Sequence, residues 1–138
     1  MGTFLNNATV KWVLAALWTL VLCFLMLSPG SGTVADDVSR AFGGTEFSDA
    51  LGHTALAFVQ TLLLSRALAT SVSMRRALWM ASALTLLLLI SLEVAQIWIP
   101  DRGASLLDAS ANAVGVGLCA AAVIVSTAAA SRAEDRTR

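Results

Sequence analysis

The chain has 138 residues, of which 57% are hydrophobic and 13% are charged, and its mean hydropathy is +0.77. An ordinary soluble domain of this size cannot bury so much apolar surface, so the composition excludes a soluble fold and predicts an integral membrane protein. The formal net charge is 0, and no array of basic and aromatic residues suggests a nucleic-acid partner.

Four apolar stretches have roughly the length needed to cross a bilayer as helices. In chain order they cover residues 10–27, 50–70, 77–99 and 107–130. They leave no room for a separate soluble domain, so we predict one all-α domain over residues 1–138, an integral membrane bundle of four transmembrane helices. Residues 131–138 are expected to form a short, solvated cytoplasmic tail.

Helix-breaking residues separate the four stretches. The Pro-Gly cluster at 28–32 ends the first, and Pro100 stops the third, with Gly103 giving the following turn its flexibility. Ser105 or Asp108 is expected to cap the fourth helix.

The distribution of basic residues orients the predicted bundle, because Lys and Arg accumulate in cytoplasmic segments. Seven of the nine basic residues fit a bundle with both termini and the 70–77 connection in the cytoplasm: Lys11, Arg66, Arg75, Arg76, Arg132, Arg136 and Arg138. The exceptions are Arg40 and Arg102. The loop from 28 to 49 and the turn around residue 101 are therefore expected outside, and the outer loop is acidic.

In this topology, polar residues from three helices are expected to meet near the outer surface. Each helix carries a pair one turn apart: Asp49 with His53, Glu93 with Gln96, and Asp108 with Asn112. Such groups are costly inside a membrane, so they usually face a partner or a wet cavity. The helical period would extend these faces to Gln60 and Gly115, and Gly115 and Gly117 are expected to allow close helix packing.

Arg102 has two interpretations, because a guanidinium keeps its charge under all ordinary conditions. It could neutralise Glu93 and Asp108, or it could face an external phosphate or carboxylate. For Glu93, a purely structural ion pair with Arg102 is the plain alternative to a functional role. Gln96 and Asn112 could likewise serve only as hydrogen-bonding groups between helices.

The later part of the chain resembles the VanZ-like membrane proteins, named after a teicoplanin-resistance protein. The family pattern Glu-x-x-Gln, Pro-x-Arg, Asp-x-x-x-Asn-x-x-Gly is met by Glu93, Gln96, Pro100, Arg102, Asp108, Asn112 and Gly115. An earlier family pattern, an Asp-Lys pair followed by His, is met by Asp49 and His53, but Ala50 stands in place of the Lys. Arg40 or Arg102 could supply the missing cation. The resemblance covers residues 49–117 and implies a multi-pass protein of the bacterial plasma membrane.

Two functions are open from the residues and this resemblance. In the first, an outward-facing pocket binds a lipid-linked envelope intermediate or a lipoglycopeptide and lowers sensitivity to teicoplanin-type antibiotics; its ligand-binding residues would be Asp49, His53, Glu93, Gln96, Arg102, Asp108 and Asn112. In the second, a membrane-embedded hydrolase or transferase acts on a lipid-linked phosphate or acyl substrate. Glu93 or Asp108 would then be the general base, His53 its acid-base partner, and Arg102 would stabilise negative charge.

We predict no cofactor and no bound metal ion, because the sequence lacks His-x-x-x-His or Glu-x-x-His spacing. An oxygen-rich metal site made by His53 with Asp49, Glu93 and Asp108 is the alternative interpretation of the same residues. For His53 itself, a hydrogen-bonding role and proton transfer are also open, since imidazole exchanges protons near neutral pH.

Overall fold

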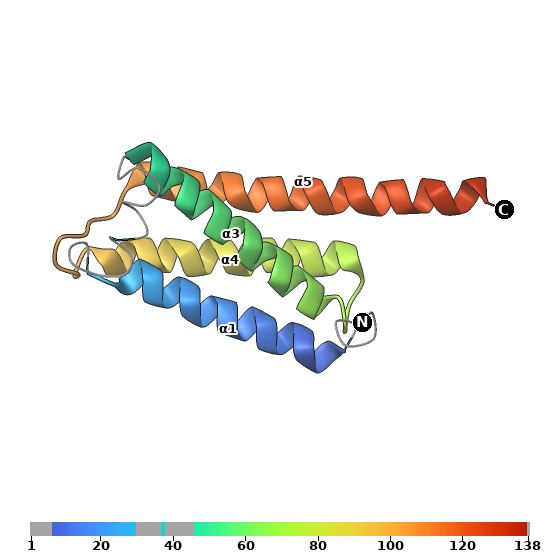
Figure 1. Ribbon diagram of the computed structural model, residues 1–138, viewed down its shortest axis with the longest axis horizontal. Coiled ribbons are helices and arrows are strands. Elements are labelled where there is room, and N and C mark those ends of the chain that lie inside the picture. Colours follow the sequence, from blue (N-terminus) through green and yellow to red (C-terminus); the bar gives the residue numbers. More distant parts are fainter. Residues whose placement is uncertain (1–6, 30–36, 38–45, 138) are drawn as a thin grey trace.

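The computed structural model describes residues 7–29, 37 and 46–137, and these contain four long α-helices (Figure 1). They are α1 (Ala8–Leu27), α3 (Glu46–Leu68), α4 (Met74–Gln96) and α5 (Leu106–Arg136). The all-helical prediction is therefore confirmed. Arg40 and most of the predicted acidic outer loop lie outside the described residues.

Three of these helices, α1, α4 and α5, are long and apolar enough to cross a membrane. Many large apolar side chains lie on the outside of the bundle, among them Leu20, Phe24, Leu87 and Val125. So many exposed large apolar side chains are typical of contact with lipid. The length and apolar character of these three helices indicate a membrane protein. Helix α3 is more polar than they are.

The helix ends follow local sequence signals. Ser105 is the N-cap of α5, and its hydroxyl accepts a hydrogen bond from the Asp108 N–H at 3.3 Å. Helix α4 ends at Gln96, three residues before the predicted end, because Pro100 has no N–H to donate to the Gln96 carbonyl and its ring would clash with that carbonyl in a continued helix. The N–H groups of residues 97–99 instead donate to carbonyls three residues back, and the chain reverses at Asp101, whose φ is 59°. The residue with left-handed backbone in this connection is therefore Asp101, which precedes Gly103 by two residues.

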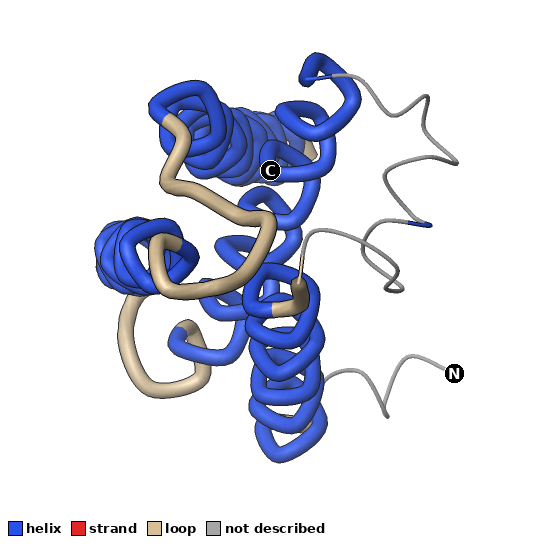
Figure 2. Tube along the Cα trace, turned by 90° about the vertical axis from the view of Figure 1, so that its left-hand side faces the viewer, coloured by secondary structure: helices blue, strands red, loops and turns tan. Residues whose placement is uncertain are grey.

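The helices run alternately up and down, so one end of the bundle gathers the C-terminal ends of α1 and α4 and the N-terminal ends of α3 and α5 (Figure 1). Helix α3 crosses the others and contacts all three. Figure 2 looks at this end of the bundle, where the α4–α5 connection passes across it. The main apolar core beneath comprises Leu22, Met26, Ala57, Leu89, Leu92 and Val116.

Polar side chains join the helices inside this core. The Gln60 amide donates to the Thr19 hydroxyl at 3.0 Å and connects α3 to α1. The Gln96 amide donates to the Met26 carbonyl at 2.8 Å and connects α4 to α1. These hydrogen bonds satisfy buried polar groups that have no water to bond in an apolar environment. Gln60 thus belongs to a separate helix contact and not to an extended polar face with His53.

Helix α5 continues well past the bundle. Residues 131–136 are helical, whereas the sequence led us to expect a frayed tail, and residues 124–137 are all exposed. In Figure 1 this half of α5 projects beyond the other three helices. Residues 131–136 are Ser-Arg-Ala-Glu-Asp-Arg, so the apolar stretch has ended, but Arg, Ala and Glu still favour helix, which explains why the prediction ended the helix too early.

Candidate functional site

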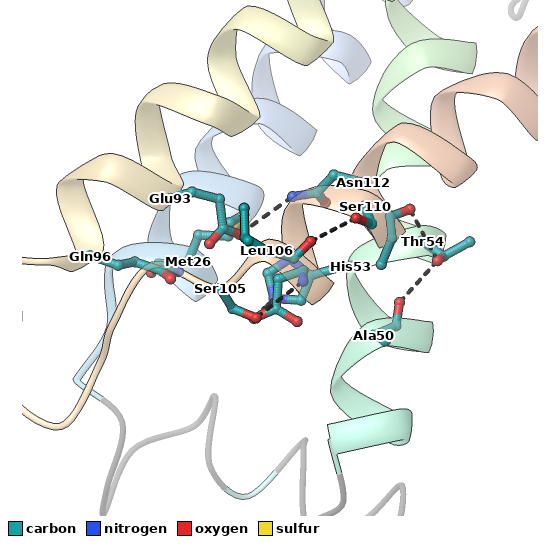
Figure 3. A network of polar contacts seen from close by, with 12 residues as sticks. Met26, Ala50, His53, Thr54, Glu93, Gln96, Ser105, Leu106, Ser110 and Asn112 are labelled. Carbon is teal, nitrogen blue, oxygen red and sulfur yellow. Dashed lines mark hydrogen bonds and ion pairs between the residues drawn. The ribbon is translucent and has the colours of Figure 1, made fainter.

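Four side chains from three helices form one polar cluster at the gathered end of the bundle: His53 of α3, Glu93 of α4, and Asp108 and Asn112 of α5. The His53 Nδ1 lies 3.5 Å from Glu93 Oε1, and its Nε2 lies 3.8 Å from Asp108 Oδ2. Asn112 Nδ2 donates to Glu93 Oε1 at 3.4 Å (Figure 3). The imidazole therefore stands between two carboxylates, one on each side of the ring.

Close approach of α3 and α5 positions this cluster. Gly115 of α5 lies directly against the backbone of Thr54, the residue after His53. The Thr54 hydroxyl donates to the Ala111 carbonyl at 3.1 Å, next to Asn112 (Figure 3). A glycine at this position lets the two backbones approach, so His53 comes within reach of Asp108.

The polar cluster is buried, although its members are ionisable or strongly polar. The exposed fraction is 9% for His53, 4% for Glu93 and 2% for Asn112, while Asp108 is partly exposed. Removing a carboxylate from water costs several kcal/mol in effective terms, which partner groups must offset. Burial of this kind is more typical of a functional centre than of a solvated helix end.

Several atoms of the polar cluster lack a hydrogen bond among the described residues. They are Nδ1 of His53, Oε2 of Glu93 and Oδ1 of Asn112. Buried polar atoms are nearly always satisfied in folded proteins, so three unsatisfied atoms in one small cluster indicate a place where a further group binds.

A small pocket opens beside the polar cluster. Its volume is about 160 Å³, and Asp49, Ser105, Leu107 and Asp108 line it. Asp49 is exposed at the start of α3, whereas Asp108 belongs to both the pocket and the cluster. The pocket therefore connects the buried histidine-carboxylate group with the surface of the protein.

Arg102 and Gln96, two other predicted site residues, make different contacts. Arg102 Nε donates to the Ser28 carbonyl at 3.2 Å, at the end of α1. Among the ion pairs of the described residues, the partner of Glu93 is His53 and not Arg102. The Glu93–Arg102 ion pair, one of the two interpretations that the sequence left open, is therefore not seen, and the Arg102 contact instead holds the α4–α5 connection against α1. Gln96 is fully buried, and its amide donates a hydrogen bond to the Met26 carbonyl of α1.

Some groups at the site had no signal in the sequence. Ser105 was expected only as a cap, yet it also lines the pocket, and the Thr54 hydroxyl was not singled out. A threonine one residue from a histidine on an apolar helix is unremarkable in sequence, and only helix pairing gives it a partner.

This arrangement allows two kinds of chemistry. An imidazole between two carboxylates can transfer protons, because one carboxylate orients the ring while the other side remains reactive. The same three residues can also act as ligands, since one donor atom each from His53, Glu93 and Asp108 lies within 4.8 Å of the other two.

Comparisons of the chain with protein-family models, curated proteins and solved structures found no match. The geometry of the polar cluster is therefore the main support for a function.

Proposed function

We propose that this chain is a multi-pass protein of the bacterial plasma membrane that binds the polar head group of an amphiphilic cell-envelope molecule. The observation that carries the proposal is the buried His53–Glu93–Asp108 group beside an open polar pocket at one end of an apolar bundle. The resemblance to VanZ-like proteins adds the class of ligand, a lipid-linked envelope intermediate or a lipoglycopeptide.

The proposal includes four membrane crossings, with α3 as the fourth, and both termini in the cytoplasm. Polar side chains of α3 bond inside the bundle and not toward lipid: Thr61 donates to its own helix, and Gln60 to Thr19. Intramembrane polar groups are tolerated when they face the bundle interior. Arg66 and Arg75 lie at the end opposite His53, which directs the polar cluster outward by the positive-inside rule.

The pocket limits what can bind. Its volume of about 160 Å³ is below the roughly 300 Å³ at which ordinary small-molecule sites begin, so only one polar group of a larger molecule enters. The carboxylates of Asp49 and Asp108 favour hydrogen-bond donors, such as sugar hydroxyl, amide or ammonium groups. The exposed Leu106 and the pocket residue Leu107 offer apolar surface for an attached chain.

The test is antibiotic susceptibility in a sensitive Gram-positive host. We expect wild type to raise the inhibitory concentrations of teicoplanin and dalbavancin above the empty-vector control, and Glu93→Gln and Asp108→Asn to lose this protection. Loss of a charged hydrogen bond of 1.5–3 kcal/mol corresponds to about a tenfold or greater loss of ligand affinity. Immunoblots of membrane fractions must show equal abundance.

The exposed tail variant Asp135→Asn is the matched control, since it removes one carboxylate far from the polar cluster. It should protect as well as wild type. An abundant wild type without protection would refute the antibiotic role for this chain.

A membrane-embedded hydrolase or transferase is the second candidate, favoured by the position of His53 between Glu93 and Asp108. It predicts that the purified protein releases water-soluble phosphate or head groups from lipid-linked envelope intermediates. Glu93→Gln should then abolish release, by about a hundredfold or more for a general base, yet still retain the substrate on the protein. Under the binding proposal, release does not exceed the rate without protein.

A further inference from the structure

We propose that His53, Glu93 and Asp108 bind a divalent transition-metal ion of the Zn²⁺ class. The three residues come from α3, α4 and α5, and one donor atom of each lies within 4.8 Å of the other two. This proposal goes beyond the binding of an envelope molecule and does not depend on it. It also replaces the sequence-based expectation that no metal is bound.

The distances within the cluster leave room for an ion between the side chains. The His53 nitrogens lie 3.5 and 3.8 Å from the oxygens of Glu93 and Asp108, beyond the 2.7–3.2 Å range of ordinary N–H···O bonds. These two distances involve different ring nitrogens, and an ion binds only one of them, so the relevant measure is the 4.8 Å within which one donor atom of each residue lies. Around tetrahedral Zn²⁺, with ligand bonds of 2.0–2.2 Å, neighbouring ligand atoms are about 3.3–3.6 Å apart, so the three donor atoms must draw closer together to share an ion.

An ion binds only one of the two ring nitrogens of His53, and each nitrogen faces a different carboxylate. The carboxylate beside the other nitrogen must therefore leave that contact when it becomes a ligand of the ion.

Charge and unsatisfied atoms support the same conclusion. A neutral imidazole and two ionised carboxylates carry two negative charges, which one divalent cation neutralises. Oε2 of Glu93 is a buried acceptor without a hydrogen bond among the described residues, and Glu93 is more than nine-tenths buried. An acceptor can be satisfied by a cation as well as by a donor, so a metal ion would satisfy this oxygen.

The donor types indicate which ions fit. Imidazole suits Zn²⁺ and other late transition metals, whereas Mg²⁺ and Ca²⁺ prefer oxygen ligands only. Three protein ligands leave one position of Zn²⁺ open, as in sites that bind water or substrate. Asp108 lines the pocket, so that position would be reachable from the pocket.

His53 is the only histidine in the chain, which makes a direct test possible. Protein without a histidine tag, labelled with ¹⁵N-histidine, would be purified in detergent, stripped with chelator and titrated with Zn²⁺. We expect one equivalent of Zn²⁺ to shift one of the two ring ¹⁵N resonances and to saturate. Mg²⁺ in the same protein should leave both resonances in place.

Binding measured by calorimetry on variants then identifies the other two ligands. Glu93→Gln and Asp108→Asn should each weaken Zn²⁺ binding by tenfold or more, because even second-shell changes cost about 10–100-fold. Asp135→Asn, in the exposed tail, should bind Zn²⁺ as wild type does.

Ring ¹⁵N resonances that do not respond to Zn²⁺ would overturn the proposal. This titration uses the wild-type protein, so its outcome does not depend on whether the variants fold. Binding weakened equally by Asp135→Asn would also overturn it, because it would show an adventitious ion only. The two proposals can fail independently. If the protein binds one equivalent of Zn²⁺ but does not change antibiotic susceptibility, the metal site is supported and the antibiotic role is refuted.

Discussion

Replacing Gly115 by alanine should remove most of the folded protein, whereas the same change at Gly117 should be harmless. A Cβ on Gly115 would collide with the backbone carbonyl of Thr54 and come within 2.9 Å of the Ala57 Cβ. Backbone atoms cannot rotate away, so α3 and α5 would have to separate. The Thr54–Ala111 hydrogen bond would break with them.

Overpacking of a close contact lowers stability by about 1–3 kcal/mol. Because the collision is with backbone atoms, we expect the loss of stability in Gly115→Ala to lie at or above the upper end of this range. The measurement is the free energy of unfolding in mixed detergent micelles, together with membrane abundance. Gly117 is exposed and a Cβ there meets nothing within 4 Å, so Gly117→Ala should be neutral or stabilising, since alanine favours helix by about 1 kcal/mol over glycine. Equal effects of the two changes would show that α3 and α5 do not approach as described.

The second large effect is expected for Asn112→Asp. Asn112 is 2% exposed and donates to Glu93, and Asp108 lies one turn away on the same helix. An aspartate here removes the donor and adds a third carboxylate to a buried group. Uncompensated buried charge costs about 3–5 kcal/mol, so we expect a loss of stability of this order.

Stability of the Asn112→Asp protein should be measured by unfolding in chelator, because additional carboxylates around His53 would also attract cations. The deficit relative to wild type should shrink as the pH is lowered, since protonation of a carboxyl group relieves like-charge repulsion. Ser110→Asp is the control: it adds the same charge near the same end of α5, but on the exposed face, where Ser110 bonds only its own helix. A comparable loss from both variants would contradict the special role of the buried position.

The unsatisfied atoms link the proposed ion to the proposed ligand. An ion held by His53, Glu93 and Asp108 would turn an acceptor-rich pocket into one that also attracts oxygen ligands such as phosphate or sugar. Once the ¹⁵N titration has established Zn²⁺ binding, susceptibility measurements on cells depleted of zinc would test whether the ion takes part in binding the ligand.

Much of the fold was predictable because bilayer length and helix-breaking residues are local properties of the chain. The all-helical architecture followed from the apolar stretches, and Ser105 is one of the two residues that were expected to cap α5. Predicted helix ends differed from the observed ones by several residues, most at the C-terminus of α5. There, residues 131–136 are mostly polar and exposed, so hydropathy alone gives no signal that the helix continues.

Predictions of side-chain contacts were less successful than predictions of helices. The helical period placed Gln60 two turns from His53, but Gln60 bonds Thr19 of α1. The charge of Arg102 suggested a pair with Glu93, but its guanidinium donates to the Ser28 carbonyl. Gly117 was expected to allow close packing and faces open space, whereas Gly115 makes the close approach.

The sequence by itself determined the environment of this protein, the approximate spans of its helices and the polar residues that their ends carry. Only the tertiary structure decided that His53 stands between Glu93 and Asp108, and that Asn112 joins them. The physical reason is that the 3.6-residue period fixes where a side chain lies around its own helix axis, but not how one helix is rotated and tilted against another. That rotation is set by the close contact of Gly115 with Thr54 and by the hydrogen bonds between helices.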